Sequence, residues 1–168
     1  MGARPRPATL DGALVSAAPP GTVPKPRNAE TGDLDAVFAL EMASFSDPWS
    51  RESFDELLVN ERATFGVLRS ADDGLLAYGV VLAAADEAEL ANIAVVQAHR
   101  GRGLGDVLLA WLLQVAADRG AHSIFLEVRA SNTAAQRLYE KQGFTRISVR
   151  KAYYRHPTED AVVMKAEL

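Results

Sequence analysis

An apolar helical stripe between two apolar strand-like segments constrains the fold of this chain more than any other feature. Residues 104–116 carry apolar side chains three or four positions apart, the spacing of a helix that packs one face on a core. Apolar runs precede and follow this helix, at 90–96 and 123–128. A strand–helix–strand sequence forms a right-handed crossover, in which the two strands are parallel. The sequence therefore predicts a parallel strand pair inside a sheet.

Helical and strand-like segments also alternate in the rest of the chain. We expect further helices at about 31–44, after a cap at Ser50, and from Ser131 or Asn132 to Gln142. The first of these helices has an apolar stripe formed by Leu34, Val37, Phe38, Met42 and Phe45. We expect further strands at 64–69, 75–85, about 144–152 and 160–166, with the outer strands paired as antiparallel hairpins. The predicted fold class is α/β (α+β): a mixed, mostly antiparallel twisted sheet with a central parallel pair and helices on both faces.

The first 27 residues differ in composition from the rest of the chain. They contain six of the eight prolines and show no periodic apolar face. We therefore expect a disordered, Pro-rich tail at 1–27 and a single domain at 28–168. A cleaved targeting signal is the competing interpretation, which Asp11, Gly12 and Ser16 disfavour because they interrupt any apolar segment.

The charge of the chain is unevenly distributed. The net charge is −4, with +3 on residues 1–27 and −7 on the remainder. An acidic body is a poor binder of nucleic-acid phosphates, so we expect a cationic partner and no direct nucleic-acid contact. No apolar run approaches the roughly 20 residues needed to span a bilayer. We therefore expect no membrane association and a cytoplasmic location.

The residue types present exclude several kinds of reactive site. The chain has no cysteine, which rules out thiolate nucleophiles and zinc ribbons. His99, His122 and His156 stand too far apart in the sequence to form a metal-binding motif. We therefore expect no metal site.

A glycine-rich turn, Arg100-Gly101-Arg102-Gly103-Leu104-Gly105, joins the strand at 90–96 to the following helix. Glycines let a backbone approach a ligand closely, and a helix N-terminus offers free N–H groups to an anion. The turn lacks the Gly-Lys-Ser/Thr of a Walker A loop, and Asp106 stands where the dinucleotide motif needs its last glycine. It fits the pattern Q/R-x-x-G-x-G/A, which is typical of a pyrophosphate-binding turn. A tight strand-to-helix turn with incidental arginines is the alternative.

Two side chains have the chemistry of a proton-transfer pair. Glu127 lies in the otherwise apolar strand at 123–128, on the same face as Phe125 and Arg129. It is either ion-paired with Arg129 or a general base, because burial raises the pKa of a carboxyl group toward the range useful for deprotonating an ammonium. Tyr139, in the next helix, is either a core residue or a general acid, since a phenol can protonate a leaving thiolate.

Several motifs occur in the order typical of one enzyme family. They are Asn92-Ile93-Ala94-Val95, the turn at 100–105, Leu126-Glu127-Val128-Arg129-Ala130-Ser131-Asn132 and Leu138-Tyr139-Glu140-Lys141-Gln142-Gly143-Phe144. With Pro48-Trp49-Ser50 and Tyr153-Tyr154, they resemble the GNAT (GCN5-related N-acetyltransferase) superfamily, and within it the bacterial ribosomal-protein-alanine N-acetyltransferases of the RimI type. The resemblance covers about 28–168. One departure is the additional Asp47 before Pro48, at the peptide entrance.

The resemblance implies a GNAT fold whose central parallel strands are splayed around acetyl-CoA, with no metal. The backbone of Ile93, Ala94 and Val95 would pair with the pantetheine arm, and Asn132 would bind the amide part of the cofactor. The pyrophosphate would bind the turn formed by Arg100, Gly101, Arg102, Gly103, Leu104, Gly105 and Asp106. Glu127 would act as the general base and Tyr139 as the general acid.

The same resemblance implies a reaction and an acceptor. Acetyl would pass from acetyl-CoA to the α-amine of an N-terminal alanine on a small-subunit ribosomal protein, by direct attack and without an acyl-enzyme. We expect a monomeric enzyme. The alternatives are a lysine side chain, another N-terminus or a small amine as acceptor, and a non-catalytic acyl-CoA-binding module. An acidic rim would attract a basic acceptor, unless it is an ordinary solvated face; it consists of Asp47, Glu52, Asp55, Asp86, Glu87 and Glu89.

Overall fold

The computed structural model describes residues 24–168, so the tail expected at 1–27 lies mostly outside the described residues. The helices are α1 (Leu34–Ser44), α2 (Arg51–Val59), α3 (Leu104–Asp118) and α4 (Thr133–Lys141), with short 3-10 turns η1 (Thr31–Asp33) and η2 (Gln97–His99). The strands are β1 (Arg27–Asn28), β2 (Ala63–Arg69), β3 (Leu75–Ala84), β4 (Glu87–Val95), β5 (Ser123–Arg129), β6 (Thr145–Arg155) and β7 (Thr158–Glu167). Every helix and strand expected from the sequence is present, and β1 is an additional strand. None of the helices in the described part of the chain is long and apolar enough to cross a membrane.

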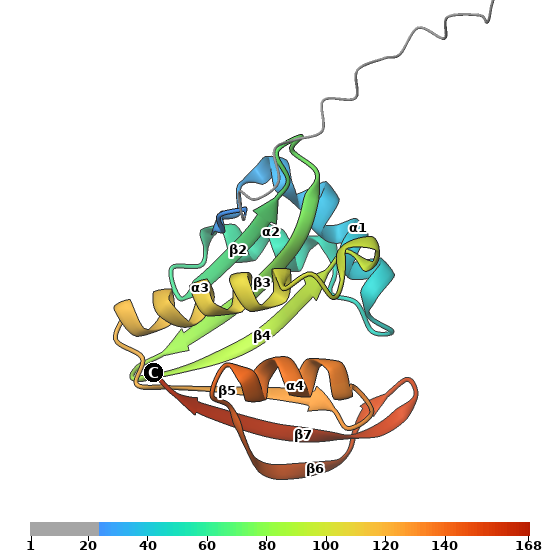
Figure 1. Ribbon diagram of the computed structural model, residues 1–168, viewed down its shortest axis with the longest axis vertical. Coiled ribbons are helices and arrows are strands. Elements are labelled where there is room, and N and C mark those ends of the chain that lie inside the picture. The colour runs from blue at the N-terminus through green and yellow to red at the C-terminus, as the bar shows by residue number, and fades with distance from the viewer. Residues whose placement is uncertain (1–23) are drawn as a thin grey trace, which may run out of the picture.

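The seven strands form one sheet in the order β1-β2-β3-β4-β5-β7-β6. β4 and β5 are parallel, and every other neighbouring pair is antiparallel. Since α3 connects β4 to β5, the predicted crossover and the predicted fold class are confirmed. In Figure 1, β4 and β5 lie close together at one end and diverge toward the other.

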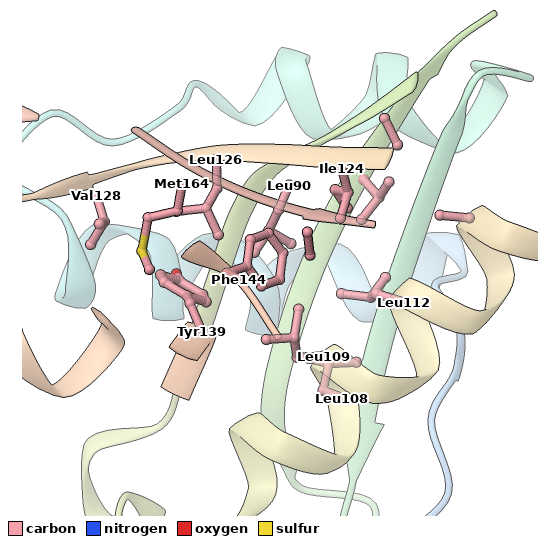
Figure 2. Packing of buried hydrophobic residues seen from close by; sticks show 14 of the residues in the cluster. Leu90, Leu108, Leu109, Leu112, Ile124, Leu126, Val128, Tyr139, Phe144 and Met164 are labelled. Atoms are coloured by element: carbon pink, nitrogen blue, oxygen red, sulfur yellow. The ribbon is translucent and has the colours of Figure 1, made fainter. Parts of the chain in front are cut away.

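Helices cover both faces of the sheet (Figure 1). α3 and α4 share one core cluster, in which Leu112, Leu126 and Phe144 are almost fully buried (Figure 2). α1 and α2 pack over a second cluster, where the rings of Phe54 and Tyr78 meet edge to face at 5.7 Å. We call these two sides the α3/α4 face and the α1/α2 face.

Helix ends follow the local signals read from the sequence. The Ser50 hydroxyl accepts a hydrogen bond from the Ser53 amide, and the Asn132 side chain accepts one from the Ala135 amide. Each bond satisfies an amide that the first helical turn leaves free. Gly143 follows α4 with a φ of +90°, a left-handed conformation that favours glycine. The caps predicted at both ends of α4 are therefore confirmed.

Two expectations are wrong in detail. Arg27 belongs to the domain, because it pairs with Val67 in the sheet and is not part of a tail. In α1, Met42 is 54% exposed, and the neighbouring Glu41 is fully buried. The helical spacing of apolar residues predicts that Met42 faces the core. Glu41 faces the core instead, because its polar partners come from strands that are distant in the sequence.

A buried carboxylate fixes the start of the domain. Asp33 is 2% exposed and accepts hydrogen bonds from Arg27 at 2.7 and 3.0 Å, and from Arg69 at 2.6 Å. The Glu30 amide donates a further bond at 2.8 Å. Burial acts to raise the pKa of Asp33, but these hydrogen bonds outweigh it and lower the pKa below its ordinary value.

We expect Asp33→Asn to lower the free energy of unfolding by about 2–4 kcal/mol at pH 7, because two arginines lose their charged acceptor. A group with a lowered folded pKa stabilises above its unfolded pKa of about 3.9 and loses that contribution as pH falls through the folded pKa. The gap between wild type and variant should therefore narrow below about pH 4 in urea denaturation. Asp35→Asn, at a side chain 92% exposed, is the control and should change stability by less than about 0.5 kcal/mol. Equal effects of the two variants would contradict the role given to Asp33.

Candidate active site

The opening between β4 and β5 begins where their pairing stops. The two strands pair only over three residues of each, Glu87–Glu89 with Ser123–Phe125. Opposite β3, Val80 pairs with Asn92 and Val81 with Leu90, so Ala91 is an extra residue in β4. A β-bulge of this kind bends its strand and increases the local twist. The bulge therefore lies where β4 turns away from β5.

The bulge also changes which side chains of β4 face each side of the sheet. Ala88 and Leu90 are in the core cluster under α3 and α4, and Ile93 and Val95 pack against it. Ala94 is buried in the cluster under α1 and α2. Beyond Glu89, the N–H and C=O groups of β4 that point toward β5 have no partner in that strand. This edge, unpaired with β5, runs along Ile93, Ala94 and Val95, the residues expected to bind the pantetheine arm; one of its groups, the Val95 carbonyl, accepts from the Arg100 side chain.

A cleft of about 310 Å³ lies at the base of this opening, on the α1/α2 face. Glu127 lines it together with Phe125, Val163 and two further acidic residues, Glu87 and Glu89. Of the acidic rim expected from the sequence, these two glutamates are the members that line the cleft. The cleft therefore combines an apolar floor with several carboxylates.

Glu127 is held by two side chains of β6. Its carboxylate accepts a hydrogen bond from the Tyr153 hydroxyl at 3.2 Å and lies 3.1 Å from the Arg150 Nε. The Glu127 side chain is 19% exposed. The ion pair with Arg129, given above as the alternative to a general base, is wrong: Arg129 binds Glu159 at 3.2 Å, and Glu127 pairs with Arg150 instead. The partners of Glu127 come from β6, more than twenty residues away, and local alternation in β5 carries no sign of them.

Tyr139 lies on the opposite face of β5 from Glu127. It is 7% exposed, packs with Val128 and Met164 in the core under α4, and its ring lies 5.8 Å from that of Phe144 (Figure 2). Burial, with a smaller effect of the neighbouring Tyr154, raises the pKa of Tyr139 above its ordinary value. At neutral pH its phenol therefore keeps its proton.

The glycine-rich turn leads from β4 into α3, as expected. Gly101 and Gly103 have φ values of +74° and +78°, in the left-handed region that other residues rarely adopt. Gly103 immediately precedes α3, whose first N–H groups have no acceptor within the helix. The Arg100 Nε donates to the Val95 carbonyl at 3.0 Å, so this side chain ties the turn to the end of β4.

The start of α3 also contacts the end of α4. A Cβ on Gly105 would come within 3.2 Å of Leu138, so a glycine allows the close approach of the two helices. The Asp106 carboxylate pairs with the Lys141 Nζ at 2.9 Å and accepts from the Gln142 side chain at 3.3 Å. These contacts join the two halves of the sheet on the α3/α4 face.

Sequence reasoning missed one buried residue near the site, Glu41. Its carboxylate accepts hydrogen bonds from the Trp49 amide at 2.8 Å, from the Asn92 side chain at 3.2 and 3.4 Å, and from the Tyr78 hydroxyl. Its backbone carbonyl accepts from the Phe45 amide at 3.1 Å. The available signal was a lone carboxylate three positions after Phe38 and four after Val37, on the apolar stripe of α1.

Comparisons with known proteins identify the family to which this fold belongs. Residues 34–144 match the family model of the Acetyltransferase (GNAT) family. The [Ribosomal protein bS18]-alanine N-acetyltransferase of Salmonella typhimurium is 39% identical over 142 residues, which span 80% of this chain and 90% of the relative. The crystal structure of the ribosomal-protein-S18-alanine N-acetyltransferase from Escherichia coli superposes with a TM-score of 0.77 at 35% identity, over 85% of this chain and 92% of that chain. Ard1 from Thermoplasma volcanium, with a TM-score of 0.80 at 23% identity over 88% of this chain and 99% of that chain, shares the fold. The chain therefore belongs to the GNAT family of acetyltransferases, among the relatives of the bacterial ribosomal-protein-alanine N-acetyltransferases.

Proposed function

We propose that this enzyme transfers acetyl from acetyl-CoA to the α-amine of an N-terminal alanine on a small-subunit ribosomal protein. The observation that carries this proposal is the opening between β4 and β5, with a carboxylate on one face of β5 and a protonated phenol on the other. The relatives named as bS18-alanine N-acetyltransferases support the alanine N-terminus as acceptor.

The residues around the opening fit acetyl-CoA. An extended pantetheine arm can add to the free edge of β4, whose backbone at Ile93, Ala94 and Val95 offers hydrogen bonds as in strand addition. The pyrophosphate suits the turn at 100–106, because no side chain lies within 4 Å of an added Cβ at Gly101 or Gly103. Asn132, at the start of α4, would bind the amide part of the molecule. When bound, acetyl-CoA supplies the thioester that the acceptor attacks.

Glu127 would prepare the acceptor for attack. A free α-amine has a pKa of about 8 and is mostly protonated at neutral pH. Glu127 takes the proton from this ammonium, directly or through a water, and the neutral nitrogen then forms the new N–C bond. Tyr153 and Arg150 hold the carboxylate in place for this step.

Tyr139 would complete the reaction from the other face. As the C–S bond breaks, its phenol donates a proton to the leaving sulfur. Its raised pKa keeps that proton available until the sulfur becomes basic. The second proton lost by the new amide nitrogen passes through water to restore the phenol. The opening between β4 and β5 connects the faces on which the two residues lie, so amine and thiolate approach and leave on different sides of the sheet.

The acceptor side of the site suits a cationic peptide. Glu87 and Glu89 place negative charge in the cleft beside Glu127, which favours an ammonium terminus followed by a basic residue. We further propose that the enzyme acts as a monomer in the cytoplasm, where ribosomal proteins are made, and uses no metal.

We expect Glu127→Gln to lower kcat/KM by about 10²–10⁴-fold, because the amide cannot accept the proton. Tyr139→Phe should lower kcat by about 10–10³-fold while it preserves the packing against Phe144. Isothermal titration with CoA should give both variants wild-type affinity. Glu167→Gln, at an exposed glutamate at the end of β7, is the control. Unchanged turnover in either of the first two variants would refute the role given to that residue, whereas CoA binding without any turnover in the wild-type chain would favour a non-catalytic acyl-CoA-binding module.

We expect Gly103→Ala to weaken CoA binding at least about tenfold, because a Cβ at this φ is strained and stands where the backbone must approach the pyrophosphate. Gly120→Ala is the matched control, since Gly120 has a φ of +94° but lies at the far end of α3. Titration calorimetry with CoA compares the two. Wild-type affinity in Gly103→Ala, or equal losses in both variants, would argue against the pyrophosphate site.

We expect peptides that begin Ala-Arg to be acetylated with a kcat/KM about 100-fold above that of N-terminally blocked lysine peptides and polyamines. Mass spectrometry of the products locates the acetyl group, and mass spectrometry of ribosomal proteins from a deletion strain identifies the acceptor in the cell. A preference for lysine or a small amine would retain the acetyltransferase and refute its proposed acceptor.

A further inference from the structure

Arg129, the last residue of β5, joins two segments that lie far apart in the sequence. Its guanidinium donates to the Ser46 hydroxyl at 3.0 Å, in the α1–α2 connection (residues 45–50). It also donates to the carbonyls of His156 and Pro157, at 3.1 and 3.2 Å, in the β6–β7 turn (residues 156–157). Figure 1 places these two segments on the side toward which β4 and β5 diverge.

The bond from Arg129 to Ser46 differs from the other contacts of residues 24–168 because it connects the two halves of the sheet at the open end of the gap. The two halves of the sheet, β1–β4 and β5–β7, are paired only at the closed end of the opening. On the α3/α4 face they are also joined by Asp106 with Lys141 and Gln142. On the α1/α2 face, among the hydrogen bonds and ion pairs of the described residues, Arg129 with Ser46 is the one link across the open end.

The guanidinium itself is firmly held. Its side chain is 23% exposed and pairs with Glu159, whose other oxygen accepts from the Ser131 amide at 2.5 Å. It also lies over the ring of Tyr154, 4.2 Å from the centroid. An arginine held on several sides can fix the positions of the groups bonded to it, because its planar guanidinium then has little rotational freedom.

Arg129 is also connected to the carboxylate of the site. The ring on which it lies, Tyr154, meets Tyr153 edge to face at 5.1 Å. Tyr153 in turn donates its hydroxyl hydrogen bond to Glu127. A continuous set of contacts therefore leads from the bridge at Ser46 to the proposed general base.

We propose that Arg129 is a positioning residue for the acceptor: it sets the spacing of the α1–α2 connection and the β6–β7 turn, and with it the width of the acceptor mouth. This proposal rests on the proposed function for the identity of the acceptor. The distance between the α1–α2 connection and the β6–β7 turn can be tested whether or not that function is correct. The acetyl-CoA elements at the turn and the β4 edge make none of these contacts, and Asn132 bonds to Arg129 only through the main chain, where its amide donates to the Arg129 carbonyl at 3.0 Å. Loss of Arg129 therefore weakens acceptor use and spares CoA binding.

The spacing can be measured directly, because the full-length chain has no cysteine. Spin labels at Asp47→Cys and Thr158→Cys, both exposed positions, report the distance across the mouth by double electron–electron resonance. We expect one narrow distribution with Arg129 present, and a broadened or longer one in Arg129→Met. Ser46→Ala removes only the hydrogen bond to Arg129 and leaves Arg129 bound to Glu159 and Tyr154. We expect this variant to broaden the distance distribution as well, and it replaces Arg129→Met in the test if that variant does not fold.

Steady-state kinetics on the unlabelled chain provides the second readout. We expect Arg129→Met to raise the acceptor KM about tenfold while the KM for acetyl-CoA stays within about twofold of wild type. Arg129→Lys, which keeps the charge but not the fork, should recover only part of the loss. Arg146→Met, at a 58% exposed arginine of β6 that pairs with Glu140, is the control.

Two results would overturn the proposal. One is an unchanged distance distribution in both Arg129→Met and Ser46→Ala. The other is an equal rise in the KM of both substrates, which would indicate general structural damage. Failure of the wild-type enzyme to acetylate any N-terminal peptide would refute the proposed function instead, and the distance measurement would still decide the role of Arg129.

Discussion

A strand in the middle of a sheet normally satisfies its backbone on both edges, because an unpaired buried N–H or C=O costs as much as a lost hydrogen bond. β4 breaks this pattern after Glu89, where its pairing with β5 ends. The extra residue at Ala91 bends β4 away while β3 keeps its other edge paired. The sheet therefore keeps a row of backbone groups without a partner in β5, which an extended ligand can satisfy apart from the Val95 carbonyl already bound by Arg100, and every proposed role of the surrounding side chains depends on this row.

The proposed proton acceptor and proton donor also lie on opposite faces of the sheet beside the opening. Side chains of β5 alternate, so Glu127 faces the α1/α2 side while Leu126 and Val128 pack with Tyr139 under α4. The acidic cleft and the glycine-rich turn thus lie on different routes into the same gap. If the proposed roles hold, such an arrangement lets the acceptor side change while the acetyl-CoA side stays the same.

Local pattern was enough to predict the helices, most strands, the crossover and the caps, because periodicity and turn residues are properties of neighbouring positions. It failed where distant residues decide. The burial of Glu41 needs Tyr78 and Asn92, and the partner of Arg129 proved to be Glu159. Strict alternation from Leu90 would also place Asn92 and Ala94 on the α3/α4 face. They lie on the α1/α2 face because of the bulge at Ala91, which no local signal in the sequence marks. For the site, the motifs singled out Glu127, which lines the cleft, and Ile93, Ala94 and Val95, which lie on the β4 edge; their roles stay predictions, and the contacts that hold Glu127 came only with the fold.

One consequence concerns the short segment between Phe45 and Trp49. The amides at its two ends both bond to Glu41, one to the main-chain carbonyl and one to the carboxylate. A single residue of α1, Glu41, thus holds both ends of the loop that contains Asp47. Because both ends of this loop are held by one residue, a change in its length would alter the loop itself before the helix or the sheet, at the place where we propose that the acceptor enters.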